Sequence, residues 1–92
     1  MNGRTFKTTP QFRRALRKLP AGQKRAAKIA FGIFKQDPFD PRLRTHRIHR
    51  LSAIMRRPVY AVEIEGDLRA VFYVENDVVV SFNIGTHAIY EQ

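Results

Sequence analysis

Residues 59–85, VYAVEIEGDLRAVFYVENDVVVSFNIG, carry the strongest periodic pattern in this chain. Apolar side chains alternate with other residues along three stretches, and such alternation puts the apolar side chains on one face of a strand. Gly66-Asp67 and Glu75-Asn76-Asp77 separate the stretches and favour turns. The pattern predicts three antiparallel strands joined by short loops. The residues expected to share the apolar face are Tyr60, Val62, Ile64, Leu68, Ala70, Phe72, Val74, Val78, Val80, Phe82 and Ile84.

The register of these strands predicts where their polar side chains meet. Loops of odd length keep the even-numbered positions on one face of the sheet. Phe72 then pairs with Val80, and Glu65 pairs with Arg69. Asn83 is expected opposite Arg69, so that Glu65, Arg69 and Asn83 form one row across the exposed face.

Two helices are expected before the strands. Thr9 and Pro10 are the residue types favoured at an N-cap and at the first helical position. Apolar residues recur at helical spacing over residues 12–19 and again over about residues 21–36. Asp37-Pro38 ends the second helix, because the residue before a proline is pushed out of the helical region.

The remaining segments complete the expected fold. Residues 4–8 weakly predict a first strand, and residues 37–51 predict an irregular basic loop. Thr86 is expected to cap a short C-terminal helical turn that runs through Tyr90. The fold class is therefore α+β, with two N-terminal helices packed on a small antiparallel sheet in the order β-α-α-β-β-β.

Length and composition restrict the kind of protein. The chain has 92 residues, which we expect to form one domain, residues 1–92. It has no cysteine, so neither a disulfide nor a thiolate metal site is available, which is compatible with a reducing cytoplasm. No apolar run has the length of a transmembrane helix, and residues 1–10 contain no apolar signal segment. We therefore expect a soluble intracellular protein.

Positive charge is concentrated in the first part of the chain. Residues 1–57 contain 16 of the 17 Lys and Arg and only two acids, whereas residues 58–92 contain one arginine and six acids. A basic stretch of this kind favours a polyanionic partner, and an acidic protein fits almost as well. The polar faces of the two helices explain many of these charges without any ligand. The basic residues that they do not explain are Arg42, Arg44, Arg47, His49, Arg50, Arg56 and Arg57.

A second polar group is expected where the last strand ends. Gly85 allows a sharp turn or a close approach, and His87 follows beside the predicted polar row. Such an arrangement suits phosphodiester chemistry: Arg69 can hold a phosphate, His87 can move a proton, and Tyr90 can stack on a base. Each residue also has a simpler interpretation: Arg69 pairs with Glu65, His87 is a surface residue of the last helical turn, and Tyr90 covers the open end of the core. Their convergence at one corner of the sheet favours a site.

Other titratable residues are weaker candidates. His46 and His49 have the spacing of two metal ligands, but the surrounding arginines repel a cation, so we expect no metal here. Either histidine can instead contact phosphate, and solvation alone explains them equally well. Glu63 and Asp67 can supply a general base, although strand pairing and turn formation also account for them. The sequence has no Gly-rich phosphate loop, nucleophile elbow or dinucleotide fingerprint.

Three segments together resemble the RelE/ParE superfamily of bacterial type II toxins, closest to its YafQ-like and RelE-like endoribonuclease branches. They are DPFDPRLRTHRIHRL, residues 37–51; EIEGDLRAVFYV, residues 63–74; and VVVSFNIGTHAIY, residues 78–90. The resemblance implies a twisted sheet with two helices on one side. It also implies cytoplasmic, metal-independent and cofactor-free cleavage of mRNA in the ribosomal A site, restrained by a cognate acidic antitoxin.

The resemblance also implies roles for individual residues. Arg69 matches the phosphate-binding arginine, His87 the histidine of the terminal motif, and His46 the histidine of the basic loop. Asp67 aligns with an acid of the family. Two positions depart from the pattern: Tyr90 stands three residues after His87 instead of four, and Glu63 replaces a further histidine. The expected catalytic residues are Arg69, His87, His46, Glu63, Asp67 and Tyr90, and the basic residues named above are expected to bind RNA.

Two other functions stay open. A ParE-type toxin has the same scaffold but inhibits DNA gyrase by protein contact, so the fold cannot separate the two. An RNA-binding module would keep the basic surface and have no catalytic activity. The terminal Gly-Thr-His, which ParE-type chains generally lack, favours the nuclease.

Overall fold

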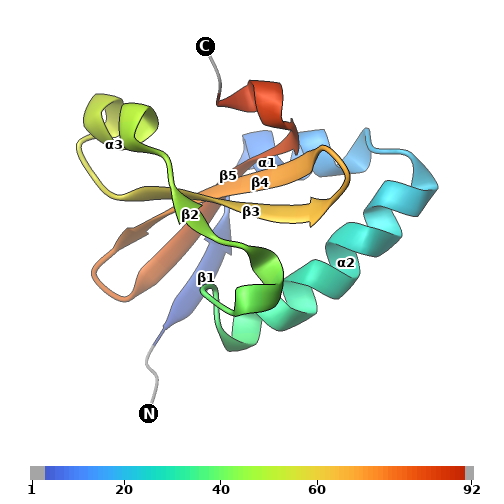
Figure 1. Cartoon of the computed structure of the whole chain (residues 1–92), viewed down its shortest axis with the longest axis horizontal. Helices are drawn as coiled ribbons and strands as arrows, with labels where there is room; N and C mark the ends of the chain where they lie inside the picture. The colour runs from blue at the N-terminus through green and yellow to red at the C-terminus, as the bar shows by residue number, and fades with distance from the viewer. Residues whose placement is uncertain (1–3, 91–92) are drawn as a thin grey trace.

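The computed structural model describes residues 4–90 and has an α+β fold, which confirms the expected class (Figure 1). Its elements, in chain order, are β1 (Thr5–Thr8), α1 (Pro10–Arg17), α2 (Ala21–Gln36), the 3-10 helix η1 (Pro41–Leu43), β2 (His46–Arg47), α3 (His49–Met55), β3 (Val59–Glu65), β4 (Leu68–Glu75), β5 (Val78–Thr86) and the 3-10 helix η2 (His87–Ile89). No helix within residues 4–90 has the length and apolarity needed to cross a membrane.

The sheet has five strands in the order β1-β5-β4-β3-β2. β3, β4 and β5 form the predicted antiparallel meander, and β2 adds to β3, also antiparallel. β1 pairs with β5 in parallel, so the sheet is mixed and the expectation of a purely antiparallel sheet was wrong. A parallel pair needs a long crossover between its strands, and the chain from α1 to β4 provides it.

The N-terminal helices begin and end where the sequence predicts. Thr9 caps α1 by accepting a hydrogen bond from the Phe12 amide at 3.1 Å, and Pro10 occupies the first turn. Both helices pack on one face of the sheet, called here the helix face. Figure 1 shows α2 and α3 flanking the sheet from opposite sides. The buried residues of this core are Phe12, Ala27, Ala30, Phe34, Leu43, Val62, Leu68, Ala70, Phe72, Val79 and Ile84.

A β-bulge in β5 changes the register from the predicted one. Phe72 pairs with Ser81 and Val71 pairs with Asn83, which leaves Phe82 as an extra residue. The predicted Phe72–Val80 pair is therefore wrong. One inserted residue reverses the facing of every side chain on one side of it. Consequently Val79, rather than its neighbours Val78 and Val80, enters the core of the helix face.

A second irregularity lies between β3 and β4. Glu63 pairs with Arg69 and Glu65 pairs with Leu68, so Ile64 is the extra residue. The predicted row of Glu65, Arg69 and Asn83 is therefore wrong, because each partner of Arg69 lies two residues from the predicted one: Glu63 in β3 and Gly85 in β5.

The opposite face of the sheet, called here the open face, has its own small core. Ile48 packs with Ala61 and Val71, and α3 contributes Leu51. The sequence predicted only a basic loop over residues 37–51, because α3 is seven residues long and its N-cap makes no side-chain hydrogen bond. Tertiary burial stabilises a helix of this length, since isolated short helices are marginal.

Ser52 attaches α3 to the sheet. Its Oγ accepts a hydrogen bond from the Val59 amide at 2.8 Å, and the residue is buried. We expect Ser52→Ala to lower the free energy of unfolding by about 1–3 kcal/mol, because it leaves a buried amide without its partner. Denaturant unfolding measures this free energy. Ala53→Ser, at an exposed neighbour, should change it by less than about 0.5 kcal/mol, and equal effects would contradict the role given to Ser52.

Candidate active site

Two rows of paired residues cross the open face. Ala61 pairs with His46 and Val71, and Val71 pairs with Asn83. Ala61 and Val71 are buried in the small core of this face. Directly paired residues point to the same side of a sheet, so His46 and Asn83 lie at the two ends of a row on the open face.

The second row contains the arginine predicted as the phosphate ligand. Arg69 pairs with Glu63 on one side and with Gly85 on the other. Arg69 alternates with Leu68 and Ala70, which lie in the core of the helix face, so Arg69 points to the open face. The structure thus brings His46, Glu63 and Arg69 to one face of the sheet, although they come from three strands.

The Arg69 guanidinium is only partly satisfied. Its Nη1 donates to the carbonyl oxygens of Gly66 at 2.8 Å and Leu68 at 3.3 Å. Its Nε is buried and has no hydrogen-bond partner among residues 4–90. Among the described residues, 4–90, no ion pair includes Arg69, so the simpler interpretation in which Glu65 neutralises it was wrong. A buried donor without a partner is costly and indicates an acceptor from outside the chain.

His87, which follows β5, forms a pair with Asp67 in the turn between β3 and β4. Leu68 pairs with Thr86, which places their neighbours Asp67 and His87 side by side. The distance from His87 Nδ1 to Asp67 Oδ1 is 2.7 Å, and both side chains are about half exposed. Because the carboxylate accepts at Nδ1, the other nitrogen, Nε2, is on the far side of the ring from Asp67.

Tyr90 lies between the two histidines. Its ring centroid is 6.4 Å from that of His46 and 6.3 Å from that of His87, both edge to face. Tyr90 also packs against the small core of the open face, so the simpler interpretation, a cover for apolar residues, holds as well. Although Tyr90 stands three residues after His87 instead of four, its ring lies near both histidines.

Gly85 lets η2 fold back on β5. A Cβ at this position would lie 2.9 Å from Ile89 Cγ2, so any larger residue displaces η2. The prediction that Gly85 allows a close approach of the chain is therefore confirmed. Thr86 precedes η2 as expected, but its side chain makes no capping hydrogen bond.

The basic residues predicted to bind RNA divide into two groups. Arg42 forms a two-point contact with Asp40, with Nε–Oδ1 at 3.0 Å and Nη2–Oδ2 at 2.9 Å, and this pair lowers the pKa of Asp40 to about 2. Arg57 pairs with Glu75 at 3.1 Å and lies over the Tyr73 ring at 4.5 Å. The others are exposed: Arg44, Arg47, His49, Arg50 and Arg56.

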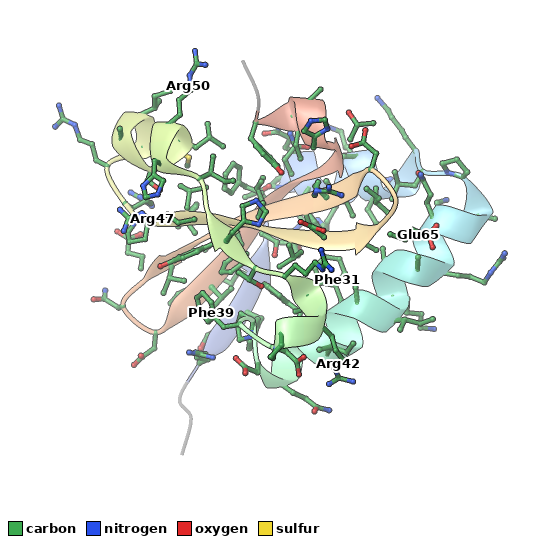
Figure 2. The ribbon with its side chains drawn as sticks, viewed as in Figure 1. Phe31, Phe39, Arg42, Arg47, Arg50 and Glu65 are labelled. Carbon is green, nitrogen blue, oxygen red and sulfur yellow. The ribbon has the colours of Figure 1, made fainter. Side chains whose placement is uncertain are left out.

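These cations do not form one compact patch. Figure 2 shows Arg47 and Arg50 beside α3, whereas Arg42 lies near η1. Arg44 and Arg56 have positive φ angles of 50° and 57°. Both residues stand at the C-caps of short helices, where they turn the chain. Their backbone conformation therefore has a structural role that the charge pattern did not reveal.

Asn83, which the sequence placed in the polar row but not among the catalytic candidates, lies at the end of the other row on the open face. Its Oδ1 accepts a hydrogen bond from the Ile84 amide at 2.9 Å, next to the bulge. This leaves the amide nitrogen of the side chain to donate elsewhere. The only signal in the sequence was a polar residue inside an apolar strand. Within residues 4–90, no three His, Asp or Glu side chains are grouped as for a metal ion.

No protein-family model matches the sequence, and no curated protein matches it. Several solved structures share its fold. The archaeal RelE in the RelE–RelB complex from Pyrococcus horikoshii OT3 is 18% identical, with a TM-score of 0.69, over 94% of this chain and 96% of the other. A chain of the E. coli DinJ–YafQ toxin–antitoxin complex is 14% identical, with a TM-score of 0.69, over 97% and 98%. A metal-bound toxin from Helicobacter pylori is 15% identical, with a TM-score of 0.65, over 95% and 98%.

These likenesses confirm, at the level of the fold, the resemblance to RelE and YafQ found in the sequence. They extend over nearly all of this chain and of the solved chains. Because the sequence identities are low, these likenesses show a shared architecture and do not by themselves show a shared catalytic activity.

We expect Gly85→Ala to displace η2 and thereby to move the rings of His87 and Tyr90, because the added methyl group overlaps Ile89. The ring-proton chemical shifts of both residues should change while the rest of the spectrum is retained. Ile89→Ala in the same chain should restore them by removing the overlap. Gly22→Ala is the control, since its nearest neighbour is 3.8 Å away. Unchanged ring shifts in Gly85→Ala would contradict this account of the turn.

Proposed function

We propose that this chain is the toxin of a type II toxin–antitoxin system and cleaves mRNA in the ribosomal A site without a metal ion. The observation that carries the proposal is the position of Arg69. Its guanidinium lies on the open face with only part of its hydrogen bonds made, two residues after Asp67, which pairs with His87. Such an arrangement offers one charged anchor for a phosphate and one titratable ring beside it.

The reaction uses a nucleophile that RNA itself provides. The 2′-oxygen attacks the adjacent phosphorus, the bond to the 5′-oxygen of the next nucleotide breaks, and the products are a 2′,3′-cyclic phosphate and a 5′-hydroxyl. One proton leaves the 2′-hydroxyl and one reaches the departing 5′-oxygen. Negative charge builds up on the non-bridging oxygens in the transition state, and Arg69 is the group that stabilises it.

The hydrogen bonds at the two histidines support a division of the two proton transfers between them. His46 Nδ1 lies 2.9 Å from the carbonyl oxygen of Arg44, which can only accept, so Nδ1 carries the proton. In the neutral ring Nε2 then has a lone pair, and His46 serves as the general base. His87, held at Nδ1 by Asp67, serves as the general acid through Nε2.

The remaining predicted residues have supporting roles. Tyr90, packed between both rings, stacks on a base or donates to the phosphate. Glu63 is the cross-strand neighbour of Arg69, and this position supports a role as an alternative general base. The exposed cations Arg44, Arg47, His49, Arg50 and Arg56 attract the RNA backbone, whereas Arg42 and Arg57 contribute less, because each is already paired with a carboxylate.

The proposal includes partners and a location. A cognate acidic antitoxin binds the basic chain, as the RelE–RelB and DinJ–YafQ complexes illustrate for proteins of the same fold. The protein acts in the bacterial cytoplasm, on the ribosome and its mRNA.

Arg69→Ala tests the phosphate anchor. We expect it to abolish growth arrest and to lower cleavage by about a hundredfold or more, because the developing charge loses its preorganised partner. Purified ribosomes programmed with mRNA provide the measurement. Arg14→Ala, an exposed arginine on α1, is the matched control and should cleave normally. Toxicity that survives in Arg69→Ala together with double-strand DNA breaks would favour the gyrase-inhibitor alternative.

The two histidines can be separated by changing the leaving group. His46→Ala and His87→Ala should each lower cleavage by about 10²- to 10⁴-fold. In a substrate with sulfur in place of the bridging 5′-oxygen, the thiolate leaves without a proton. This substrate should restore cleavage by His87→Ala and not by His46→Ala. Rescue of the His46 variant instead would reverse the two roles, and rescue of neither would remove His87 as the acid.

A further inference from the structure

The loop between α2 and η1 presents an aromatic ring at the surface. Phe39 is 42% exposed, and it is the one aromatic residue among the three large apolar side chains that are exposed within residues 4–90. A single exposed apolar side chain is common on protein surfaces and needs no ligand to explain it. Phe39 differs from such a residue in the rigidity of its backbone, in the packing of its ring and in the cations beside it.

Hydrogen bonds on both sides of Phe39 fix its backbone. The Phe39 amide donates to Asp37 Oδ1 at 2.9 Å, and the Asp40 amide donates to the Asp37 carbonyl oxygen at 3.1 Å. The carbonyl oxygen of Pro38, a buried residue, accepts a hydrogen bond from the Thr45 hydroxyl. The loop is therefore a rigid support for the ring, and loops held in this way by a scaffold often carry binding residues.

Aromatic contacts hold the ring of Phe39 in one orientation. Tyr60 and Phe72 are stacked with their centroids 5.4 Å apart, and Phe39 is nearly perpendicular to Tyr60 at 5.0 Å. Arg4 lies over the Phe39 ring at 6.0 Å from the centroid, which is the outer limit of a cation–π contact. This side of the ring is therefore covered by a loosely held cation instead of by the core, and a flat group can stack there.

The edge strand β2 links this ring to the candidate active site. Arg47 pairs with Tyr60, so both point to the helix face, whereas the preceding residue, His46, points to the open face. In the view of Figure 2, Phe39 lies between Arg47 and Arg42. Because β2 is the last strand of the sheet, an RNA strand that passes around this edge contacts His46 on one side and Arg47 and Phe39 on the other.

The charge beside Phe39 suits a nucleic acid. Residues 41–62 contain six arginines and no acid. Of the two acids in the loop, Asp40 is held by Arg42 in a two-point contact, and Asp37 turns one oxygen to the backbone of its own loop. Arg47 forms no ion pair among residues 4–90. Proteins bind single-stranded RNA with this combination, in which a ring stacks on a base while cations hold the adjacent phosphates.

We propose that Phe39 is a stacking platform for a base of the RNA that flanks the scissile linkage, and that Arg47 contacts an adjacent phosphate. The base lies on the side of the ring that Arg4 now covers. Every base has a π-face, so the platform accepts any base; it adds affinity and fixes the position of the strand. This inference rests on the proposed function for the identity of the ligand.

A tryptophan at the platform reports stacking directly. The chain has no tryptophan, so Phe39→Trp introduces a single fluorophore. A short single-stranded RNA with 2′-methoxy groups, which block cleavage, should quench its fluorescence, and added salt should weaken binding. Ile29→Trp is the matched control, exposed on α2 beside Glu63 and Glu65, and should not be quenched. Equal quenching in both variants, no quenching in Phe39→Trp, or the same quenching by an acidic peptide would overturn the inference.

An abasic nucleotide separates stacking from a structural role of Phe39. Phe39→Leu keeps an apolar side chain against Tyr60 and should lower RNA affinity by about tenfold, as expected for the loss of one stacked base, whereas Phe39→Tyr should bind as the parent does. In the parent, one abasic position along the RNA should cost the same factor. Phe39→Leu should lose nothing further at that position, because both changes remove one contact. Additive losses at every position would overturn the platform.

Cleavage on the ribosome is measured separately from RNA binding. Phe39→Leu should raise the KM for ribosomes programmed with mRNA and leave kcat unchanged, because the ring does not touch the reacting atoms. A lower kcat with the same KM would contradict this role. Stacking at Phe39 in a chain that never cleaves RNA would reject only the nuclease, whereas normal cleavage without stacking would reject only the platform.

Discussion

The extra residue Phe82 in β5 is the constraint on which both faces of the molecule depend. Before the bulge, Val79 and Ser81 face the helices; after it, Ile84 does. Phe82 itself turns to the open face, where it packs against the small core and lies 5.7 Å from Tyr73. The same extra residue brings Gly85, and not Ile84, opposite Arg69. Bulges re-aim side chains in this way close to functional sites.

The larger core and the candidate site lie on different faces of the sheet. The helix face holds the larger core, with four phenylalanines, Phe6, Phe12, Phe31 and Phe34, linked by edge contacts. The open face holds a smaller core under α3 and η2 and leaves the end with Arg69 polar. The large core can therefore offset the cost of a buried guanidinium nitrogen that has no partner among residues 4–90.

The positive charge likewise serves separate purposes. Arg42 and Arg57 pair with carboxylates and fix local structure, and Arg44 and Arg56 turn the chain at positive φ. Arg69 stands apart, in the acidic half of the sequence and on a strand. The cations of α1 and α2 belong to residues 1–36, which contain no acid. From the net charge alone, all of these residues would have been assigned to one basic surface.

The sequence by itself determined the two N-terminal helices, the three-stranded meander and the resemblance to RelE and YafQ, because periodicity, Thr9-Pro10 and Asp37-Pro38 act locally. It also identified Arg69, His87 and Asp67 as candidates. Only the tertiary structure decided the parallel pairing of β1, the formation of α3 and the bulges at Ile64 and Phe82. These features depend on burial between segments far apart in the chain, and a shift of one residue reverses which face a side chain occupies. For that reason the sequence identified candidate residues of the site but did not predict which residues lie next to them in the sheet.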